Sequence, residues 1–527
     1  MAREGSVAEP TTPTGRGIEL LMLGLAAVLT TGALVLVEAN QEQSLTTDLL
    51  FVGLAYLVLF ALAHVVVRWL APYADPLILP SVALLNGIGL VMIHRLDLAR
   101  EARAELLGRD VPSGLIGAQM TWTVAGLSLF ALVLFFLRDH RTLARYGYTA
   151  GFTGLVLLAL PGLLPSSISE VNGAKLWIRI PGGPGIQPGE FAKILLLIFF
   201  AAYLVQKRNL LSTAGRRFLG MELPRARDMA PLLAAWGLSV GVLVFQRDLG
   251  SSLLIFGLVL VLLYTATERI SWMVIGLAAF SVGAAIAYQL FGHVRVRVQI
   301  WLDPFADYEG GGFQLAQALF GLGTGGVGGT GLGAGRPDLV PFAESDFIFS
   351  SLGEELGLIG LAAILIVYLV LITRGLRTAL AVRDSYGKLL ATGLSFSIAL
   401  QIFVVIGGVT KLIPLTGLTL PFLSYGGSSL LANYALVAIL LRISHVARAP
   451  LPKRPAQPRA PIAEASTELV ARPGNGSGSG SAGSGSGIGS SSGSGIGSSS
   501  GSSSGSGSTS GGGGTSPTPA SPERNDP

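Results

Sequence analysis

The sequence predicts an all-α protein that crosses a membrane about twelve times. Two features of its composition support this: the mean hydropathy of the 527 residues is +0.61, and only 13% of them are Asp, Glu, Lys or Arg. A soluble domain would carry charge on about a quarter of its residues. The third feature is a series of apolar runs, most of them near the roughly 20 residues that a helix needs to cross a hydrocarbon core.

Twelve apolar runs are expected to be the membrane spans. They are residues 18–38, 48–70, 77–94, 116–137, 147–164, 189–205, 229–245, 250–266, 271–291, 346–373, 388–409 and 428–444. Residues 1–17 are polar and lack the apolar core and cleavage site of a removable signal peptide. We therefore expect them to form a cytoplasmic N-terminal tail.

The basic residues indicate the orientation. Lys and Arg gather in the even-numbered connections and after the last span, which is typical of cytoplasmic segments. These residues are Arg138, Arg141, Arg145, Lys207, Arg208, Arg216, Arg217, Arg225, Arg227, Arg374, Arg377, Arg383, Lys388, Arg442, Arg448, Lys453 and Arg454. We expect a multi-pass protein of the plasma membrane with both termini in the cytoplasm and the long loop 292–345 outside.

Composition also limits the chemistry. The pI near 9.4 and the net charge of +5 do not indicate a nucleic-acid partner, because the basic residues stand in short blocks between apolar runs. The chain has no cysteine and only five scattered histidines, so no metal site or catalytic triad built on these residues is predicted. No cofactor is predicted, and a divalent cation is left open. Catalysis would have to rest on carboxylates, Lys, Arg and the backbone.

The longest polar interruption between the spans begins at Arg295 and gathers most of the candidate residues. Asp303 and Asp307 lie four residues apart around a proline, which predicts a turn rather than a regular helix. The aromatic residues Trp301, Phe305 and Tyr308 are expected to bury this acidic pair partly. Arg295 and Arg297 supply cations for an anionic ligand.

Glycines dominate the later part of this loop. The run Gly321-Leu-Gly323-Thr-Gly325-Gly326 matches a dinucleotide fingerprint formally, but no strand is expected before it and it lacks the ending of a phosphate-binding loop. We interpret it as a mobile external loop, which leaves open a role in admitting substrate. Apolar residues between Phe313 and Phe320 have the spacing of a short helix at the membrane surface.

Ionisable residues inside spans are costly and are candidates for function. Glu190 and Lys193 open the sixth span three residues apart, which places both on one helix face. They are either a functional pair or a mutually neutralising pair that only orders the bundle. Glu354 and Glu355 in the tenth span and Asp248 after the seventh allow the same choice between chemistry and packing or helix capping.

Five motifs in order resemble the SEDS family (shape, elongation, division and sporulation), the RodA and FtsW proteins. They are Gln187-Pro-Gly-Glu190-Phe-Ala-Lys193, Arg247-Asp248-Leu-Gly250, Asp303-Pro-Phe-Ala-Asp307 with Gly310-Gly-Gly-Phe-Gln314, Asp346-Phe-Ile-Phe349 with Gly353-Glu-Glu-Leu-Gly357, and Pro414 to Ser428. The resemblance is greatest to an actinobacterial RodA-type protein. It implies a ten-helix core at 77–445, two additional N-terminal helices within 18–76, and a tail at 446–527 that is rich first in Pro and then in Gly and Ser. The composition of that tail predicts disorder.

The resemblance implies a glycosyltransferase that polymerises lipid II, a disaccharide-pentapeptide on undecaprenyl diphosphate, into peptidoglycan during cell elongation or division. It assigns the catalytic carboxylate to Asp307 and a second functional pair to Glu190 and Lys193. The sequence departs from the family in two places: Gly189 stands where Ser is usual, and the family's Gly-Ala-x-Arg-Trp string appears here as Gly173-Ala-Lys175-Leu176-Trp177. If the missing Arg contacts phosphate in relatives, Lys175 or Arg179 must replace it.

The reaction needs a base for the acceptor hydroxyl and cations for the departing diphosphate. We expect Asp307 to be the base, with Lys193 and Arg295 or Arg297 near the diphosphate and Asp303, Glu354 and Glu355 as secondary candidates. Asp248 and Lys175 are further substrate-binding candidates, and Arg179 is an alternative to Lys175. A class B penicillin-binding protein, a transpeptidase, is the expected partner. The alternatives are a lipid II flippase and a non-catalytic scaffold for the transpeptidase.

Overall fold

The computed structural model describes residues 15–41, 47–110, 113–171, 173–179, 185–212, 216–218, 221–223 and 226–450, without the side chains of 47–48 and 209–229. Most of the predicted N-terminal tail, and residues 451–527 with the Gly/Ser-rich segment, lie outside the described residues.

Twelve apolar helices form the bundle within the described part of the chain. They are α1 (Arg16–Asn40), α2 (Thr47–Leu70), α3 (Ile78–Leu106), α4 (Leu115–Phe136), α6 (Gly147–Leu163), α8 (Pro188–Ser212), α9 (Ala226–Phe245), α10 (Leu249–Thr267), α11 (Ser271–Leu290), α14 (Ile348–Ala381), α15 (Ser385–Val409) and α16 (Gly427–Arg448). Ten are long and apolar enough to cross a membrane, and α6 and the part of α9 from Ala230 to Phe245 are shorter apolar helices. The predicted all-α, polytopic fold is confirmed, and each predicted span falls on one of these helices.

The connections contain short elements. The helical ones are α5 (Arg141–Arg145), α7 (Ser166–Ser169), α12 (Gly292–Leu302), α13 (Phe313–Gly325) and the 3-10 turn η1 (Pro337–Leu339). Strands β1 (Glu170–Val171) and β2 (Ala174–Lys175), β3 (Ile178–Arg179) and β4 (Gly185–Ile186), and β5 (Arg216–Phe218) and β6 (Met221–Leu223) pair as three antiparallel hairpins. The short helix expected at the loop's apolar stretch is α13.

Local sequence explains several helix boundaries. Pro188 occupies the first position of α8, where its missing N–H and fixed φ suit a helix start. The Asp248 carboxylate accepts a hydrogen bond from the Ser251 N–H and caps α10, and Asp384 caps α15 through the Gly387 N–H. Within α14, Gly357 has φ 65° and ψ −172°, a conformation that breaks the helix and that glycine adopts most readily.

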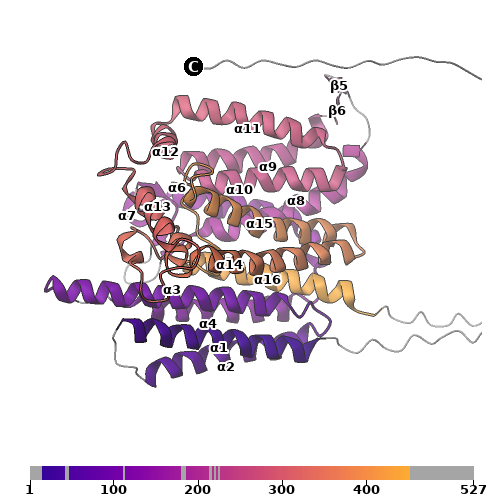
Figure 1. Ribbon diagram of the computed structural model, residues 1–527. Helices are drawn as coiled ribbons and strands as arrows, with labels where there is room; N and C mark the ends of the chain where they lie inside the picture. The colour runs from indigo at the N-terminus through magenta and orange to yellow at the C-terminus, as the bar shows by residue number, and fades with distance from the viewer. Residues whose placement is uncertain are drawn as a thin grey trace, which may run out of the picture. The chain divides into compact units, whose positions relative to one another are not determined.

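The centre of the bundle is formed by α3, α8, α15 and α16, whereas α11 lies at its edge. In the most apolar window of each helix, 83% of residues are buried in α3 and 78% in α16, but only 6% in α11. Figure 1 shows the spanning helices lying roughly side by side, with α12 and α13 gathered at the end of the bundle beyond which α3 projects. The loop between α11 and α14 is therefore an ordered cap with two helices of its own.

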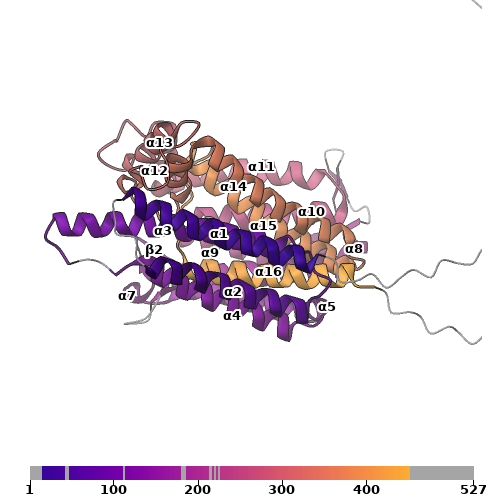
Figure 2. The ribbon, with the colours of Figure 1, turned by 60° about the horizontal axis from the view of Figure 1, so that its bottom comes forward.

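The two described ends of the chain meet at the opposite end of the bundle. The Arg16 guanidinium donates to the carbonyls of Ala71 and Ala74, and Arg448 pairs with Asp75 in the same connection. The first helix therefore begins, and the last helix ends, at one end of the bundle. From there α1 runs toward the end of the bundle that carries α12 and α13 (Figure 2).

Candidate active site

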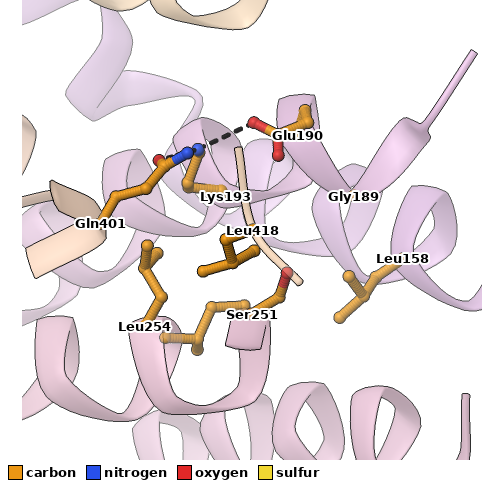
Figure 3. A pocket seen from close by; sticks show the side chains of 9 residues that line it. Leu158, Gly189, Glu190, Lys193, Ser251, Leu254, Gln401 and Leu418 are labelled. Carbon is orange, nitrogen blue, oxygen red and sulfur yellow. Dashed lines mark hydrogen bonds and ion pairs between the residues drawn. The ribbon is translucent and has the colours of Figure 1, made fainter. Parts of the chain in front are cut away.

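The ionisable pair at the start of α8 forms a buried polar cluster with a residue of α15. Lys193 Nζ lies 2.9 Å from Glu190 Oε2 and 3.0 Å from Gln401 Oε1, as Figure 3 shows. Gln401 in turn donates to the Thr419 carbonyl at 2.8 Å. Glu190 and Lys193 are each 6% exposed, so the pair is shielded from bulk water. The predicted placement of both side chains on one helix face is confirmed.

A small cavity adjoins this cluster (Figure 3). It is lined by Leu158, Gly189, Glu190, Lys193, Ser251, Leu254, Ile255, Gln401 and Leu418, and has a volume of about 10 Å³. About this much space is needed for a single water molecule. A sugar or a diphosphate does not fit in this conformation, so Lys193 is covered here.

Asp248 and Arg297 extend the charged cluster toward the end of the bundle that carries α12. Burial raises the pKa of Asp248, against the opposing effect of the Ser251 N–H. Burial likewise lowers the pKa of the Arg297 guanidinium, although Asp248 and Asp346 act in the opposite direction. Arg297 donates to the Leu415 carbonyl at 2.7 Å, on the segment that continues to Leu418 beside Lys193. The capping interpretation of Asp248 therefore holds, and the positive charge of Arg297 also acts on this carboxylate.

An apolar groove opens beside Arg297. It has a volume of about 640 Å³, and its lining comes from α9, α10, α11, α12, α15 and the segment 413–416. Trp236, Phe256, Phe280, Phe291 and Ile413 contribute, with Arg297 among them. A groove of this kind suits a ligand with a long hydrocarbon chain and an anionic head.

The structure separates the two arginines that the sequence left as alternatives. Arg295 is exposed and donates to the carbonyls of Tyr288 and Gln289 at 3.2 and 2.8 Å, which caps the end of α11. Arg297, two residues later, points to the groove and to Leu415. Arg297 is the better cation for a bound anion.

The acidic pair lies on an exposed turn, as predicted from the proline between them, but the expected partial burial is wrong. Asp303 and Asp307 are both exposed, because Phe305 and Tyr308 pack on α13 rather than over the carboxylates: their rings lie 5.7 and 6.3 Å from that of Phe320. Asp303 Oδ1 accepts the Phe305 N–H at 3.0 Å and stabilises the turn.

Three glycines shape the backbone around Asp307. Asp307 Oδ2 accepts the Gly311 N–H at 2.8 Å, and the Asp307 carbonyl accepts from the N–H groups of Gly310 and Gly312. A Cβ on Gly310 would lie 2.4 Å from Asp307 Oδ1, and one on Gly312 would lie 2.0 Å from the Pro304 carbonyl oxygen. Glycine is therefore required sterically at position 312, where the clash is with backbone, whereas a side chain at position 310 would displace the Asp307 carboxylate. Within the described residues, no hydrogen bond or ion pair joins Asp307 to Glu190, Lys193 or Arg297.

The later glycines and the two glutamates of α14 form a packed structure, which corrects the interpretation of the glycine run as a mobile loop. Gly321 to Gly325 belong to α13, and a Cβ on Gly325 would lie 2.0 Å from the Gly353 carbonyl oxygen. Glu354 Oε1 accepts the Arg336 N–H at 2.7 Å. The Glu355 carboxylate accepts hydrogen bonds from Arg95 Nε and from the Gly333 N–H, each at 3.0 Å. These contacts favour packing over chemistry for both glutamates.

Lys175 lies on β2, in the first hairpin between α7 and α8. Among the described residues its side chain makes no hydrogen bond or ion pair, whereas the Arg179 side chain donates to the Glu170 carbonyl within the same region. Arg247, next to Asp248, donates to the Gly173 carbonyl of this hairpin at 3.4 Å. Lys175 is thus the freer of the two candidates for an incoming anion.

Gln401 and Asp346 were not among the residues predicted for the site. Gln401, 1% exposed, completes the environment of Lys193, and Asp346 faces Arg297. A polar side chain inside the span 388–409 was a usable signal for Gln401, by the argument that singled out Glu190. Among the residues that the structure describes, no group of three or more His, Cys, Asp or Glu side chains is placed to hold a metal.

Comparison with known proteins relates this geometry to a family. A family model for FtsW, RodA and SpoVE, described as "Cell cycle protein", matches residues 75–449. The peptidoglycan glycosyltransferase RodA of Mycobacterium tuberculosis is 60% identical over 463 residues, which is 88% of this chain and 97% of that protein. Stage V sporulation protein E of Bacillus subtilis is 34% identical over 71% of this chain and 98% of its own length.

A solved structure agrees. A chain from a peptidoglycan synthase complex, described as coordinating polymerization and crosslinking, superposes with a TM-score of 0.55 at 27% identity and covers 70% of this chain and 97% of its own. The helices α1 and α2 precede the residues that the family model matches. The resemblance inferred from the five motifs is confirmed: the chain belongs to the SEDS family of RodA, FtsW and SpoVE proteins.

Proposed function

We propose that this chain polymerises lipid II into peptidoglycan glycan strands by direct displacement, with Asp307 as the general base. It is a multi-pass membrane glycosyltransferase, as the 60% identity to a peptidoglycan glycosyltransferase over nearly the whole relative indicates. The observation that carries the site assignment is the turn at Asp307, where the Gly311 N–H donates to the exposed carboxylate and the N–H groups of Gly310 and Gly312 donate to the Asp307 carbonyl.

The base role follows from the chemistry of the transfer. A hydroxyl of the acceptor sugar loses a proton as its oxygen attacks the anomeric carbon of the donor, and the lipid diphosphate leaves from the opposite face. Within the described residues only Oδ2 of Asp307 accepts a hydrogen bond, so Oδ1 is available for that proton. Direct displacement inverts the configuration at the anomeric carbon.

The leaving group would be held at the bundle. The 640 Å³ groove suits the isoprenoid chain, and Arg297 at the groove suits the diphosphate. Lys193, oriented by Glu190 and Gln401, is the second cation, and Lys175 is a third from the hairpin. Because the cavity beside Lys193 holds about one water, the diphosphate reaches Lys193 only if the surrounding helices separate.

The proposal includes no resident cofactor and leaves a divalent cation to accompany the diphosphate. It places both termini in the cytoplasm, because the start of α1 and the end of α16 lie at one end of the bundle and the basic connections belong inside. It also includes a class B penicillin-binding protein as partner, supported by the likeness to a chain of a synthase complex.

Polymer formation by the purified protein from lipid II in detergent tests the function, since flipping has no meaning without a bilayer and a scaffold makes no polymer. Asp307→Asn should lower the rate by about 10²–10⁴-fold, the usual contribution of a general base. The variant should stay folded, because the side chain is exposed. A fully active Asp307→Ala variant would exclude the base role.

A further inference from the structure

The last turn of α1 reaches the external loop and binds its backbone. Asn40 Nδ2 donates to the Leu332 carbonyl at 2.5 Å, and the Gln41 side-chain amide donates to the Gly333 carbonyl. Gly333 has φ 82°, and a Cβ on it would lie 2.9 Å from the Val37 carbonyl oxygen. The loop backbone therefore rests directly on α1, nearly 300 residues away in the sequence.

The side chain of Leu332 strengthens this contact. It packs against a small apolar cluster whose buried members are Leu34 and Val37 of α1, Leu49 of α2 and Val91 of α3. Exposed amide hydrogen bonds alone would contribute little, since water competes for them. An apolar anchor between two such bonds makes the attachment specific to this point of the loop.

The anchored segment is also fixed on its other side. The N–H groups of Thr330 and Gly331 donate to the carbonyls of Glu354 and Glu355 at 3.0 and 2.9 Å, just before α14 breaks at Gly357. Glu355 pairs with Arg95 of α3. Residues 330–333 are thus held between the last turn of α1 and the start of α14.

The turn that carries Asp307 is attached to the same anchored part of the loop through α13. Tyr308 accepts a hydrogen bond from Gln317 of α13 at 2.7 Å, and its ring packs on Phe320. The glycine face of α13 packs against α14 at Gly353, and the chain then leads to the anchored segment. An unbroken series of contacts joins the end of α1 to the Asp307 turn.

We propose that α1 positions the loop that carries Asp307, with Asn40 and Gln41 as positioning residues and Leu332 as their anchor. The proposal rests on the role assigned to Asp307. It gives a function in the reaction to a helix that lies outside the residues matched by the family model. Loss of the attachment should leave substrate affinity largely intact and slow the chemical step, because the base is misplaced.

The test uses the full chain, which has no native cysteine. Glu309→Cys, beside the exposed Asp307 turn, carries a nitroxide label whose spectrum reports the motion of the turn. The isosteric double variant Asn40→Asp/Gln41→Glu removes both donors without changing volume, and Leu332→Ala removes the anchor. Thr121→Ala is the matched control, because it deletes an exposed hydroxyl bonded only to the Gly117 carbonyl of its own helix.

In unlabelled protein, the double variant and Leu332→Ala should each lower kcat for lipid II about tenfold, with KM within about twofold of wild type. The label should become more mobile in both, and Thr121→Ala should change neither quantity. Unchanged label mobility, or unchanged kcat despite a more mobile label, would overturn the proposal. The label spectrum is recorded without any reaction, so it tests the attachment of the loop independently of the base role. An active Asp307→Ala variant would refute the base role, and the label mobility would still show whether α1 holds the loop.

Discussion

Replacing Lys193 by Met is the sharpest test of the buried cluster. The change keeps much of the side-chain volume and removes only the cation. Glu190 then loses the ammonium at 2.9 Å and Gln401 loses its donor at 3.0 Å, in a place where water is nearly excluded. We expect the variant to lose most polymerisation and Lys193→Arg to retain part of it.

The cost in stability follows from burial. The side chains of Lys193 and Glu190 are each 7% exposed, so removing one partner leaves the other charge without compensation, which typically costs about 3–5 kcal/mol. Replacing both partners by neutral groups of similar size is often close to neutral. The double variant Glu190→Gln/Lys193→Met should therefore recover most of the stability that Lys193→Met loses.

Stability and activity then separate the two interpretations of the pair. Unfolding in detergent and lipid II polymerisation are measured on Lys193→Met, Glu190→Gln and the double variant. If Lys193 serves the diphosphate, the double variant regains stability without activity. If the pair only orders the bundle, both return together, and an active double variant would refute the proposed role of Lys193.

Three further predictions concern the turn and the tail. Asp303→Asn should cost much less activity than Asp307→Asn in the same polymerisation assay, because the amide oxygen can still accept the hydrogen bond that stabilises the turn; equal losses would contradict the assignment. Gly312→Ala should lower polymerisation about 10²-fold at an almost unchanged melting temperature, because the new Cβ would meet the Pro304 carbonyl oxygen at 2.0 Å and shift the turn. The control Gly323→Ala places its Cβ in open space and should leave polymerisation unchanged. Truncation after Pro455 should leave polymerisation in detergent intact, since a Gly/Ser composition forms no packed site; an inactive, folded truncate would show that the tail takes part.

The lengths of the apolar runs were enough to predict the spanning helices. Every predicted span falls on a helix, because a backbone in hydrocarbon must satisfy its own hydrogen bonds and the apolar runs are long. The pairing of Glu190 with Lys193 was also predictable, since residues three apart on a helix are neighbours.

What could not be predicted depends on contacts between distant segments. The burial of Asp307 was overestimated because nothing in the sequence shows that Phe305 and Tyr308 pack on Phe320 instead. The glycine run was misjudged for a related reason: glycines can make a loop flexible, but they can also let two backbone segments pack closely, and the sequence does not distinguish the two. In this structure the glycines permit close packing, and the backbone of α14 lies against Gly325.

The separation of Asp307 from the cationic cluster fits the proposed displacement. In a direct displacement the attacking and leaving oxygens stand on opposite sides of the anomeric carbon, so the base and the cations for the diphosphate cannot share one place. Helix α12 links the two: it carries Arg297 at the groove, leads directly into the Asp307 turn, and is tied to the bundle where Trp301 donates to the Lys411 carbonyl at 3.1 Å. Any shift of α12 that admits the isoprenoid chain would therefore move the base and the cation together, which would keep their spacing suited to one sugar.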